Sequence, residues 1–329
     1  MRIGFSSVCL SGMNFEELVN WASDNGFKAL ELEAYEGSDH CNVDDGLSDE
    51  EAERMNRIAE ENDVIISNLQ YAPNMLHPDD EKRKHNHDHL KKVIDACDKL
   101  DNCEAITTFI GRDPSRGIQE NLEFMEEEYG HLVDYAKKKD VKLAIENCPM
   151  GFYFPDRFET GNIAYSPSIW ERIFDVYGPT VGLAFDPSHL LWQGIDIRRS
   201  LREFMDRVYI VHGKDCMIDD ENLARDGILN SEWVDALFVG KTGPGHRNIE
   251  WKSPVDQWWR YTIPGLGDID FKGIFQEIEM QGYDFVVIIE HEDPVWYGNE
   301  RLNKQGLKIG LKNLSQLLPQ TGYGEIEKE

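Results

Sequence analysis

The amino-acid sequence predicts an α/β fold in which eight parallel strands and their helices close into a single (β/α)8 barrel. Short β-branched and apolar runs alternate with longer amphipathic stretches throughout the 329 residues. The alternation occurs eight times, which is the number of strands that closes such a barrel. The competing open doubly wound sheet usually carries a glycine-rich phosphate turn after its first strand, and residues 7–14, SVCLSGMN, lack that glycine spacing.

Eight apolar runs have the length of buried strands and are bounded by turn residues or charged residues. The predicted strands are Arg2–Ser7, Lys28–Glu33, Val64–Leu69, Ala105–Phe109, Val141–Glu146, Val181–Asp186, Val208–His212 and Phe285–Glu290.

Helices are predicted between these runs from apolar residues at helical spacing. The helix over Asn14–Asn25 begins with a capping residue and ends before a glycine, and Ser48–Asn62 begins with the Ser-x-x-Glu pattern of a capping box. The other predicted helices are Glu81–Leu100, Gln119–Lys139, Ser168–Tyr177, Ile197–Met205, Phe271–Gln281 and Glu300–Leu318.

We expect one barrel domain over residues 1–320 and a polar, frayed tail over 321–329. A segment of about 55 residues, from about 213 to 267, separates the seventh strand from its helix. Connections this long usually have a function or structure of their own. Because the segment is rich in tryptophan, we interpret it as a lid over the site or as a contact with another subunit. A homo-oligomer and a partner subunit therefore both stay open.

Charge and composition exclude several classes of partner. The chain has 62 acidic and 34 basic residues, a net charge of −28, and no basic stripe that could hold a phosphate backbone. No apolar run approaches the ~18–20 residues that span a bilayer. We therefore expect neither a nucleic-acid nor a membrane partner. The start of the chain does not resemble a secretion signal and the six cysteines form no CxxC pair, so we expect a cytoplasmic protein with reduced thiols.

The last four predicted strands each deliver a polar side chain to their carboxyl ends. These are Glu146, Asp186, His212 and Glu290. Chemistry in barrels of this kind is located at that end. Three adjacent carboxylates would repel one another and raise their pKa values unless a cation lay among them. Oxygen ligands with one imidazole suit Mn²⁺ or Mg²⁺, with Zn²⁺ or Co²⁺ as alternatives.

Five motifs in and after these strands resemble the sugar phosphate isomerase/epimerase family, whose members have the xylose-isomerase-like TIM barrel. The motifs are AIEN, AFDPSH, VHGKD, PGLGDIDF and VVIIEHED, in that order. The resemblance covers the barrel strand by strand. It implies that Glu146, Asp186, His212 and Glu290 bind one divalent metal ion.

The same resemblance implies catalytic roles. In the ketose 3-epimerases of this family the two glutamates also transfer the proton, which makes Glu146 and Glu290 the expected acid/base pair. His189 falls where the family has a substrate-binding histidine. The epimerases place an arginine about six residues after the strand-seven histidine, but this chain has Ile218 there, and Lys214 is the nearest cation.

Aromatic residues follow several strands where the substrate should lie. We expect Tyr71 and Trp192 to bind substrate, because flat rings with polar edges suit the faces of sugars. His189 and Lys214 are the other expected substrate-binding residues. The acidic residues after strand eight, Glu292 and Asp293, disfavour a phosphate there. The expected substrate is therefore an uncharged sugar or glycoside.

The predicted reaction begins with a metal ion that polarises a ketone while a glutamate removes the neighbouring proton, which gives an enediolate. Return of the proton to the opposite face is epimerisation, and return to the adjacent carbon is isomerisation. The main hypothesis is thus a metal-dependent keto-sugar isomerase or epimerase. The alternative is a β-eliminating lyase or deglycosidase subunit acting on 3-keto-glycosides. A non-catalytic sugar-binding subunit also stays open. An apurinic endonuclease is disfavoured by the charge and by the absence of an Asp-x-His pair after strand seven.

Overall fold

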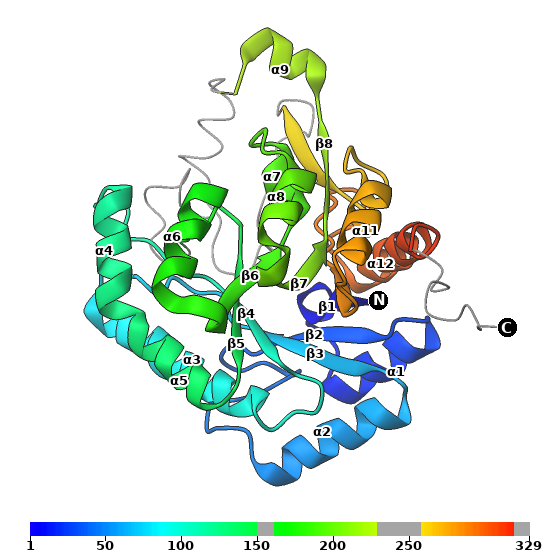
Figure 1. Cartoon of the computed structure of the whole chain (residues 1–329). Coiled ribbons are helices and arrows are strands. Elements are labelled where there is room, and N and C mark those ends of the chain that lie inside the picture. Colours follow the sequence, from blue (N-terminus) through cyan, green and yellow to red (C-terminus); the bar gives the residue numbers. More distant parts are fainter. Residues whose placement is uncertain (150–160, 229–257, 319–329) are drawn as a thin grey trace, which may run out of the picture.

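The computed structural model describes residues 1–149, 161–228 and 258–318. Within them, eight parallel strands form a closed barrel in the order β1-β10-β7-β6-β5-β4-β3-β2 (Figure 1). The strands are β1 Arg2–Ser6, β2 Ala29–Glu33, β3 Ile65–Gln70, β4 Ala105–Thr108, β5 Lys142–Glu146, β6 Val181–Phe185, β7 Val208–Gly213 and β10 Val286–Ile289. The predicted (β/α)8 barrel is confirmed, and each predicted strand overlaps an observed one.

Helices surround the barrel on its outer side (Figure 1). They are α1 Phe15–Asp24, α2 Asp49–Glu61, α3 Asp80–Cys97, α4 Ile118–Glu128, α5 Gly130–Lys138, α6 Pro167–Tyr177, α8 Ile197–Phe204, α11 Phe271–Met280 and α12 Glu300–Ser315. The single helix predicted over Gln119–Lys139 is wrong, because the chain divides it into α4 and α5 at Tyr129. This ring is fully buried against Tyr177, and the glycine that follows is a poor helix former.

The capping pattern predicted at Ser48 is half formed. Its hydroxyl accepts the Glu51 N–H, but the Glu51 carboxylate pairs with Arg54 and does not return to the cap. The reciprocal arrangement is present one helix earlier, where Asn14 and Glu17 bond to each other's backbone N–H groups.

Several short elements lie near the carboxyl ends of the strands. They are α7 Pro187–Leu191, α9 Asp220–Asp226, the antiparallel pair β8 Asp215–Ile218 and β9 Trp259–Thr262, and a 3-10 turn at Ser7–Leu10. Two further 3-10 turns, Gly178–Thr180 and Met205–Arg207, directly precede β6 and β7 at the amino ends of these strands. The β8–β9 hairpin and α9 belong to the segment predicted as an insertion, and β8 and α9 extend beyond the barrel (Figure 1). Residues 229–257 and the tail over 321–329 lie outside the described residues, so the lid or subunit contact stays a prediction.

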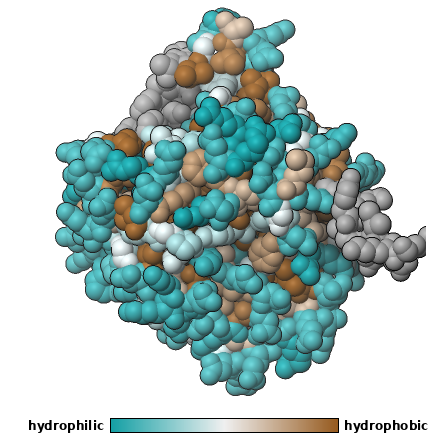
Figure 2. All heavy atoms as spheres, in the orientation of Figure 1, coloured by the Kyte–Doolittle hydropathy of each residue, from teal (hydrophilic) through white to brown (hydrophobic). Residues whose placement is uncertain are grey.

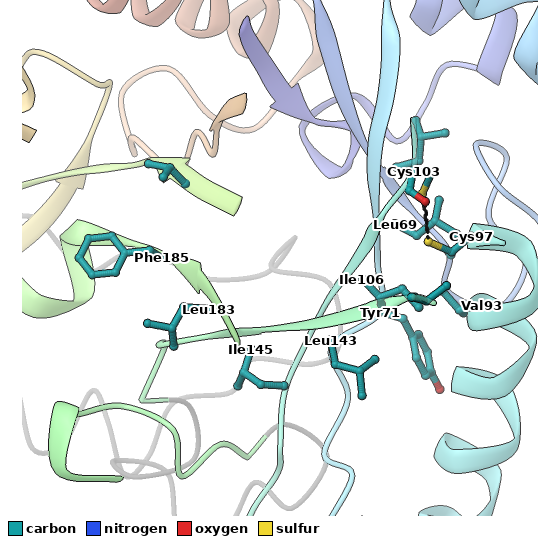
Figure 3. Packing of buried hydrophobic residues seen from close by; sticks show 14 of the residues in the cluster. Leu69, Tyr71, Val93, Cys97, Cys103, Ile106, Leu143, Ile145, Leu183 and Phe185 are labelled. Carbon is teal, nitrogen blue, oxygen red and sulfur yellow. Dashed lines mark hydrogen bonds between the residues drawn. The ribbon is translucent and has the colours of Figure 1, made fainter. Parts of the chain in front are cut away.

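The hydrophobic core has an outer layer between strands and helices. Alternate strand residues point outward, and Figure 3 shows Leu143 and Ile145 of β5 in this layer with Leu183 and Phe185 of β6. The face in Figure 2 is mainly hydrophilic, as the charge excess requires. None of the helices in the described residues is long and apolar enough to cross a membrane.

Candidate metal centre and active site

The inside of the barrel consists of an apolar layer beneath a polar layer. Small and branched side chains from several strands pack together in the lower layer, namely Ala29, Ala105, Ala144, Ala184, Ile210, Val286 and Ile288. Successive strand residues alternate between the two faces, so the residue two positions further on also points inward. Those residues are Glu31, Thr107, Glu146, Asp186, His212 and Glu290, all of them buried. The strand period therefore fixes which side chains form the site.

The four residues that the sequence singled out come together in this upper layer. Glu146, Asp186, His212 and Glu290 each offer a ligand atom, and these atoms all lie within 4.8 Å of one another. Glu146 ends β5, His212 belongs to β7, and Asp186 and Glu290 directly follow β6 and β10. Residues separated by up to 144 positions in the sequence thus meet at the carboxyl end of the barrel.

Side-chain hydrogen bonds hold the ends of β5 and β6 together. Asn147 donates its amide to the Asp186 carbonyl at 2.8 Å and accepts the Asp186 N–H at 2.7 Å. One carboxylate oxygen of Asp186, Oδ1, caps α7 by accepting the Ser188 N–H at 2.7 Å. The other oxygen, Oδ2, is buried and makes no hydrogen bond within the described part of the chain. This oxygen faces the other three residues and is available to a ligand.

Glu31 orients His212. Its Oε2 lies 3.3 Å from Nε2 of His212 and accepts a hydrogen bond from Thr107 at 2.6 Å and another from Asn68. Because a carboxylate can only accept, Nε2 of His212 carries the proton. The other ring nitrogen, Nδ1, is buried without a hydrogen bond among the described residues and lies 3.6 Å from Glu290. A carboxylate behind an imidazole is the usual support for a metal-ligating histidine.

Lys214 is a buried cation beside the four-residue group. Its ammonium lies 3.1 Å from Glu290, 3.1 Å from Glu292 and 4.0 Å from Asp186, and 4.5 Å above the ring of Tyr261. Burial lowers the pKa of Lys214, but the surrounding acids outweigh it and raise the pKa well above its ordinary value. Lys214 is therefore charged and neutralises part of the cluster.

The carboxylates of the group differ in their pKa values. Burial, reinforced by the charge of Glu290, raises the pKa of Glu146, and burial also raises the pKa of Asp186. Burial acts on Glu290 in the same direction, but Lys214 and His212 outweigh it and lower its pKa. Glu290 thus meets the exception to the expected repulsion, because a cation, the Lys214 ammonium, lies 3.1 Å from it.

The histidines of the site are also perturbed in opposite directions. Burial lowers the pKa of His212, but Glu290 and Glu31 outweigh it and raise this pKa to about 10. Burial lowers the pKa of His189 to about 4. His189 Nε2 lies 3.3 Å from Glu146 and 3.2 Å from Asp186, and its Nδ1 lies 3.0 Å from the hydroxyl of Tyr261. Tyr261 thus connects the β8–β9 hairpin to the centre of the barrel.

Two residues predicted to bind substrate, Tyr71 and Trp192, pack against other aromatic rings. Tyr71 points outward from the end of β3, beside Val93 of α3 (Figure 3), and its ring packs 4.4 Å from that of His89. The strand alternation explains this error of one position, because Gln70 is the inward residue and its amide lies 3.4 Å from Glu290. Trp192 stacks on Trp259 with ring centroids 4.9 Å apart, within an aromatic cluster on the hairpin.

The sequence interpretation also missed residues that the structure brings to the site. Glu31, Gln70 and Tyr261 all contact one of the predicted residues. The sequence did contain an indication of Glu31. An acid in the middle of a short strand that begins Ala-Leu either faces solvent or belongs to a functional site. Tyr261 carried no local signal, because its position depends on the pairing of β8 with a strand more than forty residues later.

The donor set fits a divalent cation. Three carboxylates and one imidazole, all buried, offer oxygen-rich ligation with a supported histidine. Two buried polar atoms, Asp186 Oδ2 and His212 Nδ1, make no hydrogen bond among the described residues, as expected of atoms that are placed to bind an ion. A cation bound there would displace the proton that the carboxylates hold on His212.

The chain belongs to the xylose isomerase-like TIM barrel family, whose model matches residues 19–314. It is 27% identical over 317 residues to the uncharacterized protein YfiH of Bacillus subtilis (strain 168), covering 89% of this chain and 93% of YfiH. It is 30% identical over 173 residues to inosose dehydratase of Geobacillus thermodenitrificans (strain NG80-2). That second alignment covers 52% of this chain and 50% of the dehydratase.

Solved structures share the fold over nearly the whole chain. The IOLI protein with a binding zinc atom superposes with a TM-score of 0.66 at 16% identity, covering 98% of this chain and all of that one. D-psicose 3-epimerase of Clostridium cellulolyticum H10, solved with D-tagatose, superposes with a TM-score of 0.64 at 16% identity, covering 97% and 99%. These likenesses confirm the fold.

Proposed function

We propose that this chain is a divalent-metal-dependent enzyme that isomerises or epimerises an uncharged keto sugar or sugar derivative. The observation that carries the proposal is the convergence of Glu146, Asp186, His212 and Glu290 within 4.8 Å. Two of the four are glutamates from different strands, which is what proton transfer at a carbon next to a carbonyl requires on two sides. A bound divalent ion would supply Lewis acidity to the carbonyl and neutralise developing negative charge.

The chain's own residues divide the remaining work. Glu146, whose pKa is raised by burial, is suited to take a proton from carbon near neutral pH. Glu290 stays ionised beside Lys214 and is the second proton-transfer group. His189 Nε2 carries a proton toward Glu146 and can donate it to a substrate oxygen, since Tyr261 occupies the other ring nitrogen.

A second candidate is β-elimination from a 3-keto-glycoside or a related keto-polyol. The first half is the same proton removal; the C–O bond at the next carbon then breaks, and an acid protonates the leaving oxygen. Two observations favour it. Ile218 stands where the epimerases have an arginine, and Lys214 places an ammonium beside Glu290 instead. The relative named inosose dehydratase aligns with half of this chain.

Incubation with a panel of ketohexoses and 3-keto-glycosides in D₂O with Mn²⁺, followed by NMR, separates these reactions. Isomerisation or epimerisation predicts deuterium at a carbon next to the carbonyl. The product then has the same formula as the substrate apart from the exchanged hydrogen. Elimination predicts release of water or of the aglycone. Glu146→Gln should abolish either signal, whereas Glu277→Gln, a buried acid paired with Arg198 and Arg202 outside the barrel, should retain it. The proposal fails if every compound of the panel is left both without deuterium exchange and uncleaved.

A further inference from the structure

A second group of potential ligands lies beside the first and contains sulfur. Glu146, Cys148 and His189 each offer one atom, and the three atoms lie within 4.8 Å of one another. All three residues are buried, and Cys148 is a free thiol. Glu146 and Cys148 are two positions apart at the end of β5, and His189 comes from α7.

The spacing of two of these atoms already matches a tetrahedral ion. Bonds of about 2.0–2.1 Å to nitrogen and oxygen place those two ligand atoms about 3.3 Å apart in tetrahedral geometry. His189 Nε2 and Glu146 Oε1 are 3.3 Å apart. A sulfur ligand at about 2.3 Å would lie about 3.5 Å from each of them, so Cys148 must close at most about 1.3 Å, which a small side-chain rotation provides.

The side-chain amide of Asn162 holds the loop that carries Cys148 through hydrogen bonds to two backbone carbonyls. The amide of Asn162 donates to the Glu146 carbonyl at 2.7 Å and to the Cys148 carbonyl at 2.9 Å. The backbone of Cys148 is therefore held beside that of Glu146, while the thiol can still rotate.

The histidine has the outer partner that a metal ligand needs. For Nε2 to bind an ion, the single ring proton of the neutral imidazole must be on Nδ1. The Tyr261 hydroxyl, 3.0 Å from Nδ1, can accept a hydrogen bond from this N–H, since a hydroxyl is both a donor and an acceptor. A tyrosine hydroxyl thus supports His189 as the Glu31 carboxylate supports His212.

We propose that Glu146, Cys148 and His189 form a second metal site that prefers a thiophilic divalent ion such as Zn²⁺. A thiolate, an imidazole and a carboxylate are the donors of zinc sites, whereas the group of Glu146, Asp186, His212 and Glu290 contains no sulfur and suits harder ions. Binding releases the Cys148 thiol proton to solvent. Both groups include Glu146, so an ion in the second site occupies the carboxylate that the proposed function uses as a base. Excess Zn²⁺ therefore inhibits an enzyme that Mn²⁺ activates, a consequence that rests on the proposed function.

Cobalt titration tests the site without any assay of activity. In protein saturated with Mn²⁺, added Co²⁺ should produce a near-ultraviolet sulfur-to-cobalt charge-transfer band that saturates at one equivalent. Cys148→Ser should lose this band, while Cys41→Ser should keep it, since the buried Cys41 has Cys97 and Glu51 as its electrostatic neighbours. No band in the wild type, or an undiminished band in Cys148→Ser, overturns the proposal.

X-ray absorption of the wild-type protein loaded with two equivalents of Zn²⁺ provides a second test that needs no variant. A sulfur scatterer at about 2.3 Å, averaging half an atom per zinc, is the expected result. A shell of oxygen and nitrogen alone overturns the site. Both measurements report metal binding and need no turnover of a sugar. Failure of the proposed function can therefore be distinguished from failure of this site.

Discussion

Replacing the buried cation Lys214 with methionine tests the electrostatics of the site most sharply. The ammonium lies 3.1 Å from both Glu290 and Glu292 and is nearly inaccessible to water. Removing one partner of a buried ion pair typically costs about 3–5 kcal/mol, because the remaining charge stays buried without compensation. The unfolding entropy of 329 residues is about 0.7 kcal/mol/K, so Lys214→Met should lower Tm by about 4–7 °C in EDTA.

The loss should be smaller when Mn²⁺ is present. An ion bound by Glu146, Asp186, His212 and Glu290 places two positive charges among the carboxylates that Lys214 otherwise neutralises. We therefore expect saturating Mn²⁺ to restore more than half of the lost Tm. Differential scanning calorimetry of wild type and variant, each with EDTA and with Mn²⁺, gives the four values needed.

Lys304→Met is the matched control. Lys304 likewise pairs with a carboxylate, that of Glu300 at 2.6 Å, and lies 5.5 Å from the ring of Trp21, but it is on the outer surface. A surface pair of this kind contributes about 1 kcal/mol or less, so its Tm should fall by about 1 °C in both buffers. Equal losses for Lys214→Met with and without Mn²⁺ would refute the reasoning.

Three further predictions follow from side chains around the centre and in the outer layer. Glu31→Gln should weaken Mn²⁺ binding about 10–100-fold in calorimetric titration, because His212 loses its support. Glu33→Gln, two residues further along β2, should not weaken it, because Glu33 pairs with His40; equal affinities for the two variants would contradict this. Burial lowers the pKa of His87 to about 4, below its ordinary 6.5, so its contribution to stability is complete above pH 6.5 and is lost as pH falls toward 4. His87→Asn should flatten that part of the Tm–pH curve, and an unchanged slope would assign the acid sensitivity to other groups. Gly267→Ala should lower Tm by several °C, since a Cβ there would meet an Asp215 carboxylate oxygen at 2.3 Å. Gly194 has open space around it, so Gly194→Ala should lower Tm only through backbone strain at its positive φ. Equal losses of Tm in the two variants would exclude the clash.

The fold could be predicted from the sequence because each barrel strand is a separate apolar run with its own helix. The same runs identified Glu146, Asp186, His212 and Glu290, since a polar residue that ends a buried strand is conspicuous. Glu31 was not identified, because the alternating sequence Ala-Leu-Glu-Leu-Glu of β2 also describes a strand with one solvated face. Only closure of the barrel makes that face interior.

Errors at the rim have two physical causes. An error of one position along a strand exchanges the two faces, which is why Tyr71 was chosen in place of Gln70. The β8–β9 hairpin pairs Asp215 with Thr262, a contact between distant positions that no local pattern reports. Tyr261 reaches His189 only through this pairing.

The central claim is that Glu146, Asp186, His212 and Glu290 hold one divalent ion. Elemental analysis of protein stripped with EDTA, reloaded with Mn²⁺ and desalted tests it directly. The account predicts one Mn²⁺ per chain in the wild type and in Glu277→Gln, and only a small fraction of that in Asp186→Asn. Wild-type protein without bound Mn²⁺, or Asp186→Asn with a full equivalent, would contradict it.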